Sequence, residues 1–172
     1  MATKKARPTP AASSHVVLFT GFPGFIGARL IPRLLELKPD TVFHCLVQEK
    51  FLDLARTSVE QLAEAHPGTK GRIELVVGDI TAPGLGIGET EARLLHRKLN
   101  GCYHLAAVYD LAVPREVGMR INVEGTRNVL AFLEECPHLT RFDYVSTAYV
   151  SGTAVGVYGE TELGVGQSFK NY

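Results

Sequence analysis

Short apolar runs alternate with helical stretches along most of this chain. The first run, 16–19, is continuously apolar, and the apolar residues that follow it recur at helical spacing. The alternation continues as far as residue 145. It predicts strands at 15–20, 41–47, 72–77, 102–105 and 142–145, and helices at 25–37, 52–65, 91–99 and 119–135.

Strands that alternate with helices form a parallel sheet covered on both faces, with right-handed crossovers. We therefore predict the α/β class, with a Rossmann-type doubly wound parallel sheet and helices on both faces. No internal repeat or second domain boundary is visible, so residues 15–172 are expected to form one domain. Residues 1–14 are rich in Lys, Arg and Pro and contain no apolar run, which predicts a flexible, solvated tail.

Three evenly spaced glycines separate the first strand from the first helix. Gly21 can adopt a tight turn, Gly24 allows backbone to approach a phosphate, and Gly27 allows the helix to pack near the strand. The first N–H groups of that helix would face the anion. A strand, a glycine turn and a helix together favour a dinucleotide pyrophosphate site. Any tight strand-to-helix connection could use the same glycines, and the spacing GxxGxxG alone leaves the family open.

The balance of charges and the placement of the cysteines argue against several classes of protein. Lys plus Arg and Asp plus Glu number 18 each, so no basic field exists to attract nucleic acid or an anionic membrane. The three cysteines Cys45, Cys102 and Cys136 are widely spaced in apolar runs, which indicates core residues in a reducing compartment and neither disulfides nor a metal site. The first residues lack the apolar core of a signal peptide. We expect a cytoplasmic protein with no integral membrane segment, and a transit peptide is the weaker alternative.

Ligands of such a sheet lie beyond the carboxyl ends of the strands, so the residues that follow each strand are the candidates for chemistry. After the glycines come Gln48 to Lys50, Gly78 to Ile80, Ala106 to Val108, and Ser146 to Tyr149. All five sets would meet at one edge of the sheet.

Five sequence strings, in their order and spacing, resemble those of the extended short-chain dehydrogenase/reductases. They are TGFPGFIG at 20–27, GDI at 78–80, HLAA at 104–107, NVEGT at 122–126 and YVSTAYVSG at 144–152. The Phe-Ile after the second glycine, the last of these strings and GQSFKN at 166–171 are most similar to the branch that contains fatty acyl-CoA reductases and thioester reductase domains. The resemblance spans residues 15–172.

The resemblance implies a binding role for ten residues. It places Gly21, Gly24, Phe25, Ile26 and Gly27 around the pyrophosphate, Asp79 and Ile80 at the adenine, Ala106 and Ala107 along the riboses, and Asn122 among cofactor and water contacts near the active site. Small alanines would leave room for a cofactor that crosses the sheet edge. From the residues alone, Asp79 could instead start an ordinary Asx loop, and Asn122 could be a polar group near a helix start.

The cofactor is expected to be NADP or NAD, and the residue after the second strand bears on the choice. NAD favours an acid there for the ribose 2′-OH, whereas NADP favours a cation for the 2′-phosphate. Gln48 is neither, and it departs from the Arg frequent in the resembled branch. Lys50 or Arg56 could reach a phosphate and Glu49 could serve NAD, although all three could be solvated surface charges. The branch resemblance alone favours NADP.

The chemistry implied by the resemblance is hydride transfer from NAD(P)H to a carbonyl, with a small-molecule substrate such as an acyl thioester, an aldehyde or a ketone. It makes Thr147 the catalytic hydroxyl, with Ser146 as the alternative, and leaves a homodimer open. The family's catalytic tyrosine and lysine follow the pattern Phe-x-Asn-x-Tyr-x-x-x-Lys, of which the chain supplies only 169–172. We expect the N-terminal, cofactor-binding portion of a longer reductase, inactive by itself.

Two other functions remain open at this point. Sugar-nucleotide epimerases and dehydratases and hydroxysteroid-type dehydrogenases share the glycine turn, although the former usually show Val-Tyr-Gly where this chain has Val150-Ser151-Gly152. A non-enzymatic dinucleotide-binding module is the third class. Fold analogy gives no information on the substrate.

Overall fold

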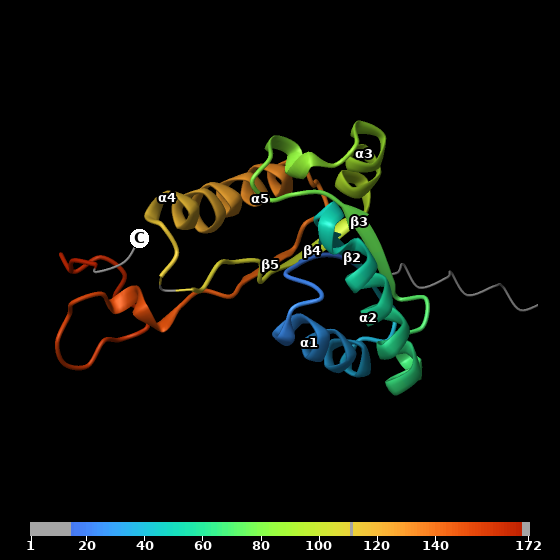
Figure 1. The fold of residues 1–172 in the computed structure, drawn as a ribbon, viewed down its shortest axis with the longest axis horizontal. Helices are drawn as coiled ribbons and strands as arrows, with labels where there is room; N and C mark the ends of the chain where they lie inside the picture. Colours follow the sequence, from blue (N-terminus) through green and yellow to red (C-terminus); the bar gives the residue numbers. More distant parts are fainter. Residues whose placement is uncertain (1–14, 111, 170–172) are drawn as a thin grey trace, which may run out of the picture.

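A computed structural model describes residues 15–110 and 112–169 of the chain. Its centre is one sheet of five parallel strands in the order β3-β2-β1-β4-β5 (Figure 1). The strands are β1 (His15–Thr20), β2 (Thr41–Val47), β3 (Ile73–Val77), β4 (Leu99–His104) and β5 (Arg141–Tyr144). The chain order reverses between β1 and β4, as in the Rossmann fold, and the predicted fold class is confirmed.

Helices cover both faces of the sheet (Figure 1). They are α1 (Phe25–Leu37), α2 (Leu52–Ala65), α3 (Glu89–Lys98), α4 (Arg115–Gly118) and α5 (Gly125–Glu134), with a π-helical segment, Met119–Glu124, between the last two. Short 3-10 turns occupy Glu49–Phe51, Pro67–Thr69, Pro83–Gly86 and Ala148–Ser151. Helices α1 and α2 lie on one face, and α3, α4 and α5 lie on the other.

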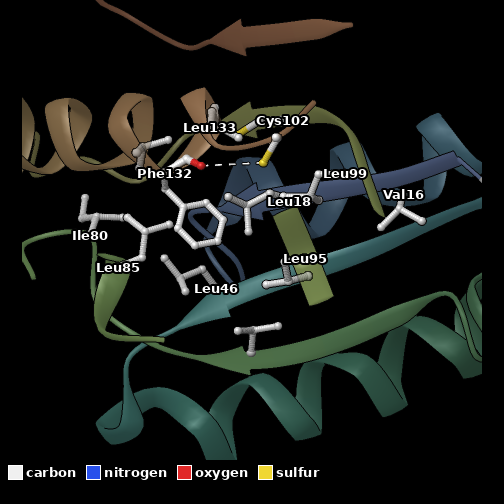
Figure 2. Packing of buried hydrophobic residues seen from close by; sticks show 13 residues of the cluster. Val16, Leu18, Leu46, Ile80, Leu85, Leu95, Leu99, Cys102, Phe132 and Leu133 are labelled. Atoms are coloured by element: carbon white, nitrogen blue, oxygen red, sulfur yellow. Dashed lines mark hydrogen bonds between the residues drawn. The ribbon is translucent and has the colours of Figure 1, made fainter. Parts of the chain in front are cut away.

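Each face of the sheet has its own apolar core, because successive side chains of a strand point to opposite sides. The rings of Phe19 and Phe43 pack edge to face with their centroids 5.9 Å apart, in one cluster with Ile31 of α1. On the other face Leu18 packs with Phe132 of α5, as Figure 2 shows. The core of this second face further includes Val16, Leu46, Ile80, Leu85, Leu95, Leu99, Cys102 and Leu133. Because both faces are buried, the strands cannot shift along one another, and the positions of the strand ends, where the site lies, are fixed.

The structure corrects two of the predicted elements. The helix expected at 91–99 spans Glu89–Lys98, and the strand expected at 102–105 spans Leu99–His104. Leu99 is fully buried and pairs with Val16, while the Asn100 side chain accepts a hydrogen bond from the Val16 N–H at 2.9 Å. Asn-Gly at 100–101 is typical of a turn, but here the pairing with β1 resumes at Gly101 after an irregularity that leaves Asn100 without a register partner.

The long helix expected at 119–135 is also different. It starts at Arg115, passes through the π-helical segment Met119–Glu124 and ends at Glu134. Single π-helical turns inside α-helices frequently occur at functional sites. The predicted tail at 1–14 lies outside the described residues, as do residues 170–172.

Candidate functional site

A cavity of about 1460 Å³ opens at the carboxyl ends of β1 to β4. Its wall contains most of the residues predicted for the site. These are Gly21, Gly24, Phe25, Ile26, Gly27, Gln48, Asp79, Ile80, Ala106 and Ala107. Asn122 and Thr147 are not part of this wall. The volume exceeds the ~300–1,000 Å³ typical of pockets for drug-sized ligands, and suits a larger, extended ligand.

The glycine turn has no room for side chains. A Cβ on Gly24 would lie 2.7 Å from the Gly21 carbonyl oxygen, and one on Gly27 would lie 3.0 Å from the Phe19 ring. Gly21 has a φ of +89°, and a Cβ there would lie 2.8 Å from the backbone of Leu105. The turn is therefore shaped by glycine at all three positions, and backbone rather than side chain lines this part of the cavity.

Helix α1 points its N-terminus into the cavity wall. Gly24 caps the helix without a side-chain acceptor, and the first turn contains no acidic residue. The first N–H groups of a helix have no acceptor within the helix, and the helix dipole places partial positive charge there. Phe25 and Ile26 of this turn line the cavity with 73% and 55% of their surface exposed. The turn can receive an anion and pack apolar surface beside it.

A direct hydrogen bond joins the ends of β2 and β3. Gln48 Nε2 donates to Asp79 Oδ2 at 2.8 Å, and Asp79 Oδ1 accepts from the Thr81 N–H and hydroxyl at 2.8 and 2.9 Å. Burial alone would raise the pKa of Asp79, but the hydrogen bonds from Thr81 and Gln48 and the charge of Lys50 together lower it. The Asp79 carboxylate is therefore held charged in the cavity wall.

The segment after β4 is held by two neighbouring elements. The Thr20 hydroxyl oxygen of β1 accepts the N–H groups of Leu105 and Ala106, both at 3.1 Å. The Asn122 amide then makes two bonds with Val108. It accepts the Val108 N–H and donates to the Val108 carbonyl, both at 2.8 Å. Asn122 thus contacts the segment that lines the cavity, and its polar atoms face Val108.

Thr147 lies at the end of the segment that follows β5. Its hydroxyl oxygen accepts the Tyr149 N–H at 3.1 Å and begins the turn Ala148–Ser151. The side chains of Ser146 and Thr147 are both exposed. The structure therefore presents Thr147 to solvent near the sheet edge, and its catalytic role stays a prediction.

Sequence reasoning missed several residues of the cavity wall. Phe51 and Leu54 lie on the β2 side, and Arg120 and Ile121 come from the π-helical segment. The Lys50 ammonium lies 4.9 Å from the centre of the Phe51 ring. An apolar residue directly after the charged pair Glu49–Lys50 was the available signal on the β2 side. Arg120 gave none, because the π-helical turn that brings it to the wall has no sequence signature.

The described part of the chain contains neither a helix that could span a membrane nor a cluster of metal ligands. Among the residues at 15–110 and 112–169, no helix is both long and apolar enough to cross a membrane. Within the same ranges no three His, Cys, Asp or Glu residues gather where they could hold a metal ion.

The sheet order, the glycine turn and the cavity at the strand ends define a Rossmann-type dinucleotide-binding fold. The NAD-binding family described as male sterility protein matches residues 19–165, and the chain belongs to this family. The family and its reductase relatives support the binding of a nicotinamide cofactor.

The chain is similar to fatty acyl-CoA reductases. It is 27% identical to fatty acyl-CoA reductase 1 of Arabidopsis thaliana, over 90% of this chain and 35% of that protein. It is 28% identical to fatty acyl-CoA reductase wat of Drosophila melanogaster, over 77% of this chain and 28% of that protein. The chain thus spans about a third of the length of these relatives.

Solved structures give a similar result. The terminal R domain of the myxalamid PKS-NRPS pathway superposes with a TM-score of 0.69 and 28% identity, over 87% of this chain and 38% of that one. The R domain of a nonribosomal peptide synthetase from Mycobacterium tuberculosis superposes with a TM-score of 0.65 and 28% identity, over 84% of this chain and 35% of that one. A UDP-glucose-4-epimerase from Stenotrophomonas maltophila shares the fold. Its TM-score is 0.60 and its identity 18%, over 80% of this chain and 38% of that one. The resemblance found in the sequence is confirmed.

Proposed function

We propose that this chain is the dinucleotide-binding part of a reductase that transfers hydride from NAD(P)H to the carbonyl carbon of an acyl thioester. The observation that carries the proposal is the cavity wall at the first turn of α1, where free N–H groups, bare glycine backbone and the absence of an acidic side chain suit a pyrophosphate. The fatty acyl-CoA reductases and R domains among the relatives support a thioester substrate.

The residues of the wall suit different parts of a dinucleotide, which would supply the hydride when bound. Gly21, Gly24 and Gly27 would hold the pyrophosphate with their backbone. Asp79 would accept from an adenine amino group, because its pKa is lowered and it stays charged. Ala106 would leave space for the ribose.

The substrate end of the site is proposed to use a hydroxyl. Thr147 would donate a hydrogen bond to the reacting carbonyl oxygen and stabilise the negative charge that develops there, with Ser146 as the alternative. No tyrosine after Thr147 is followed four residues later by lysine in this sequence. These 172 residues are therefore expected to bind cofactor without reducing substrate on their own.

A reducing compartment, such as the cytoplasm, is proposed as the location. Cys45 and Cys102 are buried within the sheet, where desolvation raises the pKa of both thiols. Burial likewise raises the pKa of Cys136 to about 11. Thiols of this kind pack as small apolar groups and react slowly.

Two measurements test the proposed function. Calorimetric titration of the chain with NADPH and with NADH should show saturable binding of at least one of them. NAD(P)H oxidation by the longer protein that contains this chain should then be followed with acyl-CoA, aldehyde and ketone substrates. Absence of dinucleotide binding would refute the proposal, and turnover of aldehydes or ketones alone would refute the thioester assignment.

A further inference from the structure

A histidine with no access to solvent lies directly beneath the cavity wall. His104 is the last residue of β4 and is 0% exposed. It pairs in register with Thr20 of β1 on one side and with Tyr144 of β5 on the other. Its ring stacks on the Tyr144 ring at a centroid distance of 5.3 Å. A polar ring in such a place must satisfy both nitrogens within the protein.

The hydrogen bonds around Thr20 fix the direction of its hydroxyl. The Thr20 hydroxyl oxygen accepts the Ala106 N–H and the Leu105 N–H, each at 3.1 Å, and these contacts use both of its lone pairs. The Leu105 N–H is shared with the Thr20 carbonyl oxygen, at the longer distance of 3.3 Å. The third contact of the hydroxyl oxygen is His104 Nδ1, at 2.7 Å. The hydroxyl hydrogen therefore points to His104, and Nδ1 is the acceptor.

The protonation of the other ring nitrogen, Nε2, follows from the role of Nδ1. A neutral imidazole that accepts at Nδ1 carries its hydrogen on Nε2. His104 Nε2 lies 3.0 Å from the Thr126 hydroxyl of α5, and this hydroxyl donates to the Asn122 carbonyl at 2.7 Å. Every donor in the series has an acceptor, so the contacts specify one tautomer of His104.

Both ends of this series reach the same segment of the cavity wall. From Nδ1 the series passes through Thr20 to the N–H groups of Leu105 and Ala106. From Nε2 it passes through Thr126 to Asn122, whose amide holds both polar groups of the Val108 backbone. The wall at 105–108 is thus held at its start and its end by groups that meet at one histidine.

We propose that His104 is a positioning residue, which as a neutral Nε2–H tautomer fixes the backbone at 105–108 in the form that receives the cofactor. The proposal rests on the proposed function for its cofactor. His104 does not line the cavity, so it acts on the ligand only through this backbone. Burial lowers the pKa of His104 to about 4, which keeps the ring neutral at physiological pH.

The wild-type chain alone tests the tautomer. A long-range proton–nitrogen NMR spectrum at pH 7 should show His104 with a hydrogen-bearing Nε2 and a bare Nδ1. A hydrogen on Nδ1, or on both nitrogens, would overturn the proposal without any variant.

Thr126 provides a matched pair of variants, because it does not itself line the cavity. Thr126→Val keeps the volume and removes the acceptor of the His104 Nε2–H, whereas Thr126→Ser keeps the hydroxyl. In Thr126→Val the Ala106 amide should exchange its hydrogen about tenfold faster and the Kd for the dinucleotide should rise about five- to tenfold. Thr126→Ser should restore both values, and the Cys45 amide in β2 should exchange equally slowly in all three proteins.

The readouts separate this proposal from the proposed function. Unchanged Ala106 exchange in Thr126→Val would overturn the positioning role, whatever the dinucleotide affinity. Faster exchange with unchanged affinity would also overturn it, since the wall would then not matter to the cofactor. If the wild type binds no dinucleotide, the proposed function fails and takes the cofactor role of His104 with it, while the NMR spectrum still decides the tautomer.

Discussion

Gln48 and Asp79 follow the ends of the adjacent strands β2 and β3 and share a hydrogen bond of 2.8 Å, in which the Gln48 amide donates. The bond engages the side chain that follows β2, where Rossmann enzymes place the group that distinguishes NAD from NADP. Gln48 therefore supports Asp79 and offers a ribose neither a carboxylate nor a cation. Lys50, whose charge lowers the pKa of Asp79, lines the cavity and is a candidate for contact with a phosphate.

This arrangement predicts weak discrimination between the two dinucleotides. The Kd values for NADPH and NADH should differ by no more than about tenfold unless Lys50 or Arg56 engages the phosphate. Gln48→Arg should move the preference toward NADPH by about tenfold or more, because a guanidinium can bind the phosphate in a bidentate manner. Calorimetric titration of both proteins measures the two ratios. A wild-type preference of about a thousandfold either way would contradict our reading of this position.

The glycine turn predicts a strong effect of one side chain. Gly24→Val should abolish dinucleotide binding, because a Cβ there would lie 2.7 Å from the Gly21 carbonyl oxygen and the branched side chain would occupy the phosphate position. Gly68→Val is the matched control, because a Cβ on Gly68 has no atom within 4 Å. Both variants should retain the wild-type circular dichroism spectrum. Equal affinity of Gly24→Val and wild type would remove the pyrophosphate assignment.

The lowered pKa of His104 predicts a loss of stability in acid. Its pKa falls from 6.5 in the unfolded chain to about 4 in the folded protein, so between these values the unfolded state binds more protons. The free energy of unfolding should therefore decrease as pH falls from about 7 to about 4, by up to about 3 kcal/mol from this residue. Burial also lowers the pKa of His15 and of His44, which adds to the same trend.

Urea denaturation at several pH values measures this effect. His104→Gln removes the titrating ring and should show a shallower dependence on pH than the wild type, although it is less stable at pH 7. Parallel curves for the two proteins between pH 7 and pH 4 would show that His104 contributes nothing to the acid sensitivity.

Elements set by local pattern could be predicted from the sequence to the residue. Strand β1 and helix α1 have the bounds expected, because one apolar run ends at three glycines and the next periodic stretch begins there. The start of β4 could not be predicted, since Leu99 joins the sheet through a partner 83 positions earlier, Val16. Long-range pairing overrides the turn preference of Asn-Gly.

Some parts of the candidate site could likewise be predicted from the sequence, and others could not. The residues that follow each strand could be assigned to one edge because the carboxyl ends of parallel strands meet there. Ten of the twelve predicted site residues line one cavity, whereas Asn122 and Thr147 do not. The Gln48–Asp79 bond and the series through His104 depend on side-chain directions in three dimensions. Thr20 and His104 lie in predicted strands, but their burial and the hydrogen bonds that join them to each other and to Thr126 could not be predicted from the sequence.

The last prediction concerns the proposed catalytic hydroxyl of Thr147. In the proposed longer reductase, Thr147→Val should leave the Kd for the dinucleotide within about twofold, because Thr147 does not line the cavity. Turnover should fall by about 10²–10³-fold, because one donor to the developing oxyanion is removed. The isolated 172-residue chain should show no turnover.

Thr147→Val also removes the acceptor of the Tyr149 N–H, so a loss of activity could come from the turn alone. Thr147→Ser separates the two causes, since it keeps the hydroxyl for both bonds and should retain most of the turnover. Ser146→Ala tests the alternative donor in the same assay of NAD(P)H oxidation. Full activity of Thr147→Val, or a larger loss in Ser146→Ala, would move the catalytic hydroxyl away from Thr147, because the group that stabilises the transition state must be the one whose removal slows the reaction most.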